Sequence, residues 1–296
     1  MSAHQALYNL IQTLPAADGT LDAYVEQSIN NHKTNNITVV MAFPLKVGGT
    51  FLRTALIRLL SKNYQSFLMR GSYASTDQAR DLYFPSILHQ HVSAVEKPMA
   101  SIAHCHMYAT KPVTSLIEGF AIPTIVNTRN IFDTLLSYYD MLEADKWEGI
   151  VAKDDFVLQS HTNYHEMSSK DRRWHLVNVA PIWYSRFYAY WIRYSDNCLE
   201  RGVKQPLWTK FDELKDHPVS LLSKIAKHVD YKHDYSKKEV TAAHRQSIDS
   251  KDQLRFNKGV SGRGVKFFNE SERETILKLM GQRQTYNRRL EGYGII

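Results

Sequence analysis

Short apolar runs alternate with helical patterns along most of this chain. Four segments that are apolar or β-branched and bounded by polar or turn residues are typical of buried strands: 37–43, 99–105, 122–128 and 206–211. Between them apolar residues recur at helical spacing, as in the stretch after Thr50 and again from Ile131 to Tyr139. This alternation predicts an α/β fold, a P-loop-like parallel sheet flanked by helices on both faces.

The segments outside this alternation are interpreted from their polarity and from the glycine and helix-capping residues that they contain. Residues 1–36 are expected to form a helical arm that packs on a single α/β domain of residues 37–296. The polar, His-rich and poorly periodic stretch 141–171 predicts an insertion that serves as a lid or as part of an acceptor site. Three glycines among basic residues indicate a loop at 257–268, and Asn269 is then a good N-cap for a further helix.

Composition indicates the class of protein and the cellular compartment. Hydrophobic residues are 43% and charged residues 23% of the chain, as is typical of globular proteins. Cys105 and Cys198 cannot build a disulfide framework or a zinc site, which favours a reducing compartment. The chain shows no signal-peptide pattern and no apolar run of the roughly 18 residues that a membrane span needs, so we expect a cytoplasmic protein without a span.

The net charge of +7 favours anionic ligands. The basic residues are scattered among 30 acidic ones rather than gathered in a stripe, so a nucleic-acid partner is not expected.

The first predicted strand runs into the segment "PLKVGGTF". In doubly wound sheets ligands bind beyond the carboxyl ends of the strands, where a helix N-terminus favours anions. Gly48 and Gly49 allow close approach of the backbone, and Lys46 adds a positive charge. These features predict a phosphate-binding loop, with a plain strand–turn–helix bearing a surface lysine as the alternative. Lys46 precedes the glycines, so the Walker pattern of ordinary ATPases is absent.

Two further predicted strands end in polar residues. Arg129 ends the third, and Ser137 lies eight residues later, about two turns into the next helix. An arginine fork matches phosphate oxygens, whereas the alternative is an Arg129–Asp133 pair with a solvent-facing serine. His104 and His106 end the second strand two residues apart and so share one face. They are candidates for metal ligands, for a general base, or for satisfied structural histidines.

The order of these motifs resembles that of the sulfotransferases that use 3′-phosphoadenosine 5′-phosphosulfate (PAPS). "PLKVGGTF" resembles the family's 5′-phosphosulfate loop P-K-S-G-T-T-[WF], "RNIFDTLLS" matches its 3′-phosphate motif, and "HCHM" resembles the end of its K-T-H-[LM] strand. "FDELKDHP" resembles Y-E-D-x-x-x-D-P, and "NKGVSGRGVKFF" resembles the closing loop R-K-G-x-x-G-D-W-K-x-x-F. The resemblance runs from about residue 37 to 282.

The resemblance implies roles for individual residues. His106 takes the position of the general base, and Lys46 and Ser137 join it as catalytic residues. The implied cofactor-binding residues are Lys46, Val47, Gly48, Gly49, Thr50, Phe51, Arg129, Ser137, Phe211, Asn257, Lys258 and Gly259. PAPS is the implied sulfuryl donor, adenosine 3′,5′-bisphosphate (PAP) the product, and no metal is required.

The acceptor implied is a hydroxyl or amine of a small molecule or glycan. A nucleotide-dependent small-molecule kinase and a catalytically silent nucleotide-binding protein are the alternatives. The aromatic run 183–194 could line the acceptor pocket, although its helical spacing favours a place in the core. His161 and His165 are acceptor-site candidates or surface histidines. The oligomeric state is left open, with a homodimer as one alternative.

The chain also departs from the family pattern at several positions. Leu45 separates Pro44 from Lys46, which shifts or bulges the loop by one residue, and His104 stands where the motif has a lysine. The other departures are Gly49 for a hydroxyl residue, Phe51 for tryptophan, Phe211 for tyrosine, Asn257 for arginine and Gly264 for tryptophan.

Overall fold

In the part of the chain that the structure describes, five parallel strands form one sheet. The computed structural model describes residues 36–68, 98–144, 157, 160, 163–249, 260–281 and 287–296. The strands are β1 (Ile37–Ala42), β2 (Gln65–Leu68), β3 (Met99–Cys105), β4 (Thr124–Thr128) and β5 (Leu207–Lys210), in the spatial order β2-β3-β1-β4-β5. Every neighbouring pair is parallel, so the predicted α/β fold class is confirmed.

The four strands expected from the sequence are present within two residues of their predicted ends. All residues of β1 and β4 are buried, as expected for a parallel sheet covered on both faces. β2 was missed, because the four residues "QSFL" at the edge of the sheet are too short and too polar to show a pattern.

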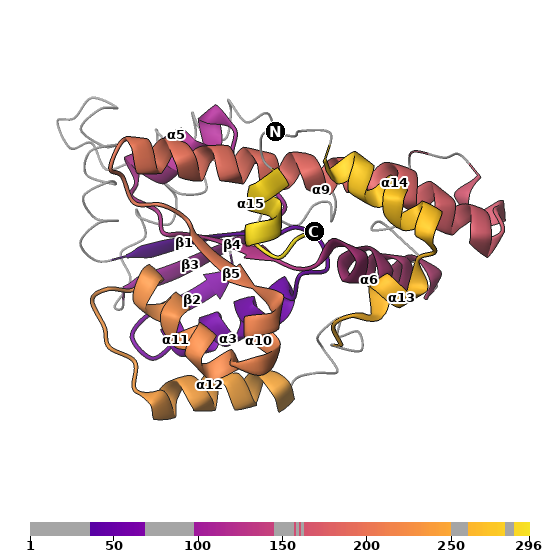
Figure 1. Cartoon of the computed structure of the whole chain (residues 1–296). Helices are drawn as coiled ribbons and strands as arrows, with labels where there is room; N and C mark the ends of the chain where they lie inside the picture. The colour runs from indigo at the N-terminus through magenta and orange to yellow at the C-terminus, as the bar shows by residue number, and fades with distance from the viewer. Residues whose placement is uncertain are drawn as a thin grey trace, which may run out of the picture.

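Helices cover both faces of the sheet (Figure 1). They are α3 (Gly49–Leu60), α5 (Lys111–Gly119), α6 (Ile131–Glu143), the 3₁₀ turn η1 (Tyr164–Glu166), α9 (Ser169–Glu200), α10 (Phe211–Asp216), α11 (Pro218–Val229), α12 (Lys237–Asp249), α13 (Arg263–Phe267), α14 (Glu270–Met280) and α15 (Asn287–Gly292). One core cluster joins the sheet to α5, α6, α9, α14 and α15, and a second joins it to α3, α11 and α12.

The aromatic run of α9 lies mostly in the first of these clusters. Tyr184, Phe187, Tyr188 and Trp191 are at most 1% exposed, so the interpretation of this run as core is right for these residues. Two of their buried polar atoms bond to distant backbone, since the Trp191 Nε1–H donates to the Met107 carbonyl at 2.9 Å and the Tyr184 hydroxyl to the Leu45 carbonyl at 3.1 Å. α9 thereby ties its core face to the end of β3.

The C-terminal segments confirm one prediction and correct another. Asn269 and Glu272 form the reciprocal capping box of α14. The loop expected at 257–268 is wrong in part, because residues 263–267 form the short helix α13. The backbone N–H groups of Gly262 and Gly264 donate to the Asp133 carboxylate at 2.6 and 2.7 Å, which docks this turn on α6.

Two predicted segments lie largely outside the described residues. The N-terminal arm of residues 1–36 is described at Asn36 alone. Of the insertion at 141–171, the ends belong to α6 and α9 and residues 164–166 form η1, while His161 falls outside. The arm, the lid and the domain limits stay predictions.

Candidate active site

The candidate site lies at the carboxyl edge of the sheet, where β1 runs between β3 and β4. Strand order reverses around β1, and ligands of open α/β sheets bind at such switch points. The loop after β1 bonds to both neighbouring strand ends. His106, after β3, contacts the Phe43 carbonyl through Nδ1 at 2.5 Å, and Arg129, after β4, donates from Nη1 to the Lys46 carbonyl at 2.9 Å. The structure therefore brings together the three segments that carry Lys46, His106 and Arg129.

Three consecutive carbonyls of this loop are held by side chains from elsewhere in the fold. The Tyr184 hydroxyl donates to the Leu45 carbonyl at 3.1 Å, Arg129 to that of Lys46, and Asn127 Nδ2 to that of Val47 at 2.6 Å. With these carbonyls bound to protein, the loop and the first turn of α3 can offer their peptide N–H groups to an anion. The loop is therefore held as an anion cradle would need to be, and its binding of a phosphate stays a prediction.

The extra residue Leu45 is accommodated by burial and by an unusual backbone. The Leu45 side chain is 7% exposed and joins the first core cluster, and Lys46 follows with φ 65°. This left-handed conformation costs a non-glycine residue roughly 1–3 kcal/mol, which the surrounding bonds must offset. Gly48, at φ 88°, is left-handed too, and a Cβ there would lie 2.9 Å from Leu214 and 3.1 Å from Phe211. Glycine is thus required at 48 by conformation and by space.

Arg129 is enclosed between the loop and the start of α10. Its guanidinium lies 4.1 Å from the centre of the Phe211 ring, and Nη2 reaches the Val260 carbonyl at 3.5 Å. Burial lowers the pKa of Arg129 from its ordinary value. Its Nε is buried and has no hydrogen-bond partner among the described residues. The carboxylate of Asp133 accepts from two backbone amides, so the alternative of an Arg129–Asp133 pair is reduced to a charge interaction that by itself raises the pKa of Arg129, without a hydrogen bond between these two described side chains.

The other predicted binding residues surround this centre. Val47 is fully buried, so only its backbone is available to a ligand, and Ser137 is 4% exposed within α6. Thr50 lies in the first turn of α3, and the next residue, Phe51, meets the His244 ring of α12 edge-on at 5.6 Å. Asn257, Lys258 and Gly259 fall outside the described residues.

The His106 ring is oriented by its bond to Phe43. A carbonyl accepts only, so Nδ1 carries the proton and Nε2 is the basic nitrogen of the neutral ring. The Trp183 ring meets His106 edge-on at 6.4 Å. Within the described parts of the chain no group of three histidine, cysteine or acidic side chains is placed to hold a metal, so the metal alternative for His104 and His106 finds no third ligand there.

Sequence reasoning missed the residues that support the loop. Asn127 and Thr209 are linked at 2.8 Å and are buried in β4 and β5, and Tyr184 belongs to α9. A polar asparagine inside the apolar run "TIVNT" was one available signal. Nothing local identified Tyr184, whose bond spans 139 positions.

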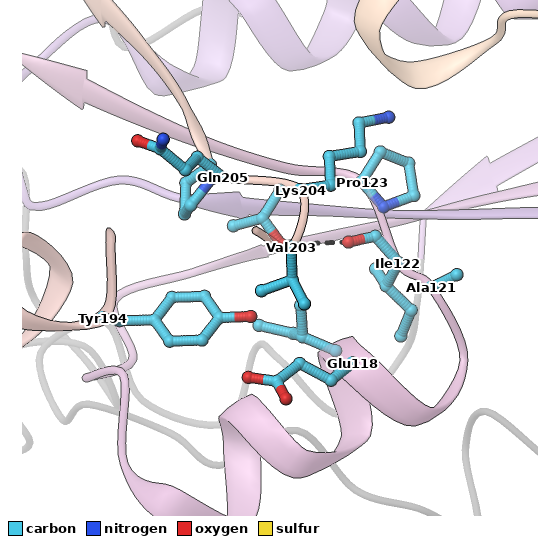
Figure 2. A pocket seen from close by; sticks show the side chains of 11 residues that line it. Glu118, Ala121, Ile122, Pro123, Tyr194, Val203, Lys204 and Gln205 are labelled. Atoms are coloured by element: carbon cyan, nitrogen blue, oxygen red, sulfur yellow. Dashed lines mark hydrogen bonds between the residues drawn. The ribbon is translucent and has the colours of Figure 1, made fainter. Parts of the chain in front are cut away.

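A separate hollow of about 180 Å³ lies at the opposite, amino edge of the sheet (Figure 2). Its lining is mainly apolar and comes from α5, the end of α9 and the starts of β4 and β5. Its charged groups are engaged, because Glu118 accepts two bonds from Arg201 and Lys204 donates to the His228 carbonyl. This hollow shares no residue with the loop edge.

Comparison with known proteins supports the fold. No protein-family model and no curated protein sequence matches the chain. The crystal structure of mouse sulfotransferase SULT7A1 complexed with PAP aligns with a TM-score of 0.56 at 13% identity, covering 90% of this chain and 93% of that chain. Retinol dehydratase in complex with androsterone and inactive cofactor PAP aligns with a TM-score of 0.50 at 12% identity, covering 89% and 85%.

These likenesses show a fold shared with PAP-bound sulfotransferases. The resemblance inferred from the motifs is therefore confirmed at the level of the fold. In the described part of the chain no helix, the 32-residue α9 included, has the length and apolar character of a membrane span.

Proposed function

We propose that the chain is a PAPS-dependent sulfotransferase that acts on a hydroxyl or amine of a small-molecule or glycan acceptor. One observation carries the proposal. The loop that bears Lys46 is bonded to the strand end with His106 on one side and to the strand end with Arg129 on the other. The segments that carry a base, an ammonium and a guanidinium thus meet beside a helix N-terminus, which suits transfer from a doubly phosphorylated adenosine.

The residues present fit such a donor. Its two anionic ends need two sets of donors, and the cradle offers N–H groups at the start of α3 beside Lys46. The buried Arg129 Nε, which has no partner among the described residues, supports an additional anion nearby. We assign Lys46 and the amides of residues 48–50 to the 5′-phosphosulfate, and Arg129 and Ser137 to the 3′-phosphate.

In the proposed reaction, His106 accepts the proton, and Lys46 with the cradle amides stabilises the leaving group. PAPS, when bound, supplies an activated sulfuryl group. His106 Nε2 takes the proton of the acceptor as that atom bonds to sulfur. Lys46 and the cradle amides stabilise the charge that develops on the leaving phosphate oxygen, and losing one such donor typically costs about 10²–10³ in rate. Lys46 supplies charge that Mg²⁺ supplies in many phosphoryl transfers, so we propose a metal-free reaction.

Aromatic side chains beside His106 suit the proposed acceptor. Trp183 stands next to the base, and Tyr108 packs against both Trp183 and Phe187. Tyr108 is half-buried and stacks on Tyr190 at 5.3 Å between ring centres. These aromatic side chains could pack against an acceptor that has an aromatic, apolar or sugar face.

Two measurements separate this function from the alternatives. PAP should raise the melting temperature of the protein, whereas ATP and an oligonucleotide should leave it unchanged. Labelled sulfate should then pass from PAPS to members of a mixed acceptor panel. Stabilisation by ATP with Mg²⁺ but not by PAP would favour a kinase, and PAP binding without transfer to any acceptor would favour a silent nucleotide-binding protein.

We include a cytoplasmic location in the proposal. Cys105 and Cys198 are free and buried, which is consistent with the cytoplasmic location expected from the sequence.

A further inference from the structure

His104 lies against the first residue of the cradle helix. A Cβ built on Gly49 would stand 2.4 Å from His104 Nε2, which is closer than any real contact. The imidazole edge therefore occupies the space beside the Gly49 backbone, at the N-terminus of α3. His104 thus reaches the same backbone that is proposed to bind the 5′ end of the donor.

The ring nitrogens of His104 make no hydrogen bond to any described residue. Its contacts are edge-on packing against the Phe43 ring, at 5.8 Å between ring centres, and against the His106 ring at 6.0 Å. The side chain is partly exposed rather than sealed in the core. An imidazole beside a helix N-terminus with no hydrogen-bond partner among the described residues has a ring nitrogen to offer to a ligand there.

The charge state of His104 follows from its surroundings. Burial, then the neighbouring His106 and Arg53, lower the pKa of His104 well below its ordinary value of 6.5. The positive end of the α3 dipole acts in the same direction. His104 is therefore neutral near pH 7, with one ring nitrogen that donates and one that accepts.

We propose that His104 is a second catalytic histidine, a neutral Nε2–H donor to the 5′-phosphosulfate end of the donor held at Gly49. This inference rests on the proposed function. The Nε2 proton stays on His104 throughout. The acceptor proton goes to His106, the sulfur–oxygen bond to the leaving phosphate breaks, and the His104 hydrogen bond strengthens as charge moves onto that phosphate oxygen.

The departures from the family motif at positions 104 and 49 are then explained together. The motif has a lysine at position 104 and a hydroxyl residue at position 49, whereas this chain has an imidazole and no side chain. The missing side chain at Gly49 leaves the space that the His104 ring fills. The imidazole of His104 supplies a hydrogen-bond donor beside Gly49, but it lacks the positive charge of the lysine in the motif.

The test compares His104→Phe, which keeps a ring without a donor, with His104→Gln, which keeps an N–H. We expect His104→Phe to weaken PAP binding about tenfold, the loss of one hydrogen bond to a charged group, and to lower turnover with PAPS about 10²-fold. His104→Gln should recover most of both. His228→Phe is the matched control, because His228 is a neutral histidine at the opposite edge, bonded to the Thr124 carbonyl. It should change stability and leave PAP affinity unaltered.

A spectroscopic measurement keeps the inference testable without turnover. In ¹⁵N-histidine NMR spectra the His104 ring should be neutral with its proton on Nε2, and that proton resonance should shift when PAP is added. Wild-type protein that transfers no sulfate would count against the proposed function alone, since the PAP titration still reports on His104. Equal PAP affinity in wild type and His104→Phe, or a His104 resonance that PAP leaves unmoved, would overturn the inference. Equal losses in the Phe and Gln variants would assign His104 to packing and overturn it as well.

Discussion

Arg129 donates from Nη1 to the carbonyl of Lys46 at 2.9 Å, so the residue assigned to one phosphate is bonded to the residue assigned to the other. The same guanidinium covers the Phe211 ring and reaches Val260 beside α13. Occupation of the 3′-phosphate position would therefore also influence the backbone that carries Lys46.

Arg129→Ala should act mainly on donor binding. We expect the Kd for PAP to rise about 10- to 100-fold, because a buried charged donor with several bonds is removed. The KM for PAPS should rise with it. A fall in kcat alone, with KM unchanged, would show that Arg129 does not hold the donor. Arg201→Ala removes an arginine at the opposite edge of the sheet and should leave PAP affinity as it was.

His106→Ala should remove turnover while donor binding survives. Loss of a general base typically costs about 10²–10⁴ in rate, and the group is not assigned to either phosphate. Isothermal titration with PAP should therefore give a Kd close to that of the wild type. His106→Asn retains a side-chain N–H that can reach the Phe43 carbonyl, and it should be equally inactive. If both variants lost PAP binding, His106 would be a structural residue of the loop.

Gly264→Ala should disturb the docking of α13 on α6. A Cβ at Gly264 would lie 2.1 Å from the carbonyl carbon of Phe132 and 2.5 Å from the backbone nitrogen of Asp133, so backbone must move. Overpacking of this kind costs typically about 1–3 kcal/mol. We expect a lower urea midpoint together with weaker PAP binding. Gly119→Ala, whose Cβ would meet nothing within 4 Å, should not lower either quantity.

His228 should make the stability of the protein depend on pH. Burial and the nearby Lys204 lower the pKa of His228 to about 4 from its ordinary 6.5. Between these values the unfolded chain binds more protons than the folded one, so the free energy of unfolding falls as the pH drops through this window. Urea midpoints measured between about pH 7 and about pH 5 should fall for the wild type and fall less for His228→Gln. A slope unchanged by this substitution would show that His228 titrates normally in the folded protein.

The cradle could be predicted because its signals are local. A β-branched strand, two glycines and a helical pattern stand within one stretch of 24 residues, 37–60, and each has a conformational meaning of its own. The capping box of Asn269 and Glu272 was found for the same reason. That His106 and Arg129 would lie beside the same loop could be predicted because parallel strands end at one edge of the sheet.

The supports of the cradle could not be predicted, because they join residues far apart in the chain. Asn127 bonds across 80 positions to Val47 and Tyr184 across 139 to Leu45. These contacts exist only once sheet and helices have assembled. Nor did the glycine-rich spelling of 257–268 show that Gly262 and Gly264 would present their amides to Asp133 and turn part of a predicted loop into α13.

The fit of the His104 ring beside Gly49 couples the two positions at which this site departs from a lysine and a hydroxyl residue. A Cβ at position 49 would stand 2.4 Å from the imidazole and 2.8 Å from the Phe43 ring, so a side chain there requires both rings to move. Two positions 55 apart in the chain therefore cannot be exchanged independently of each other or of Phe43.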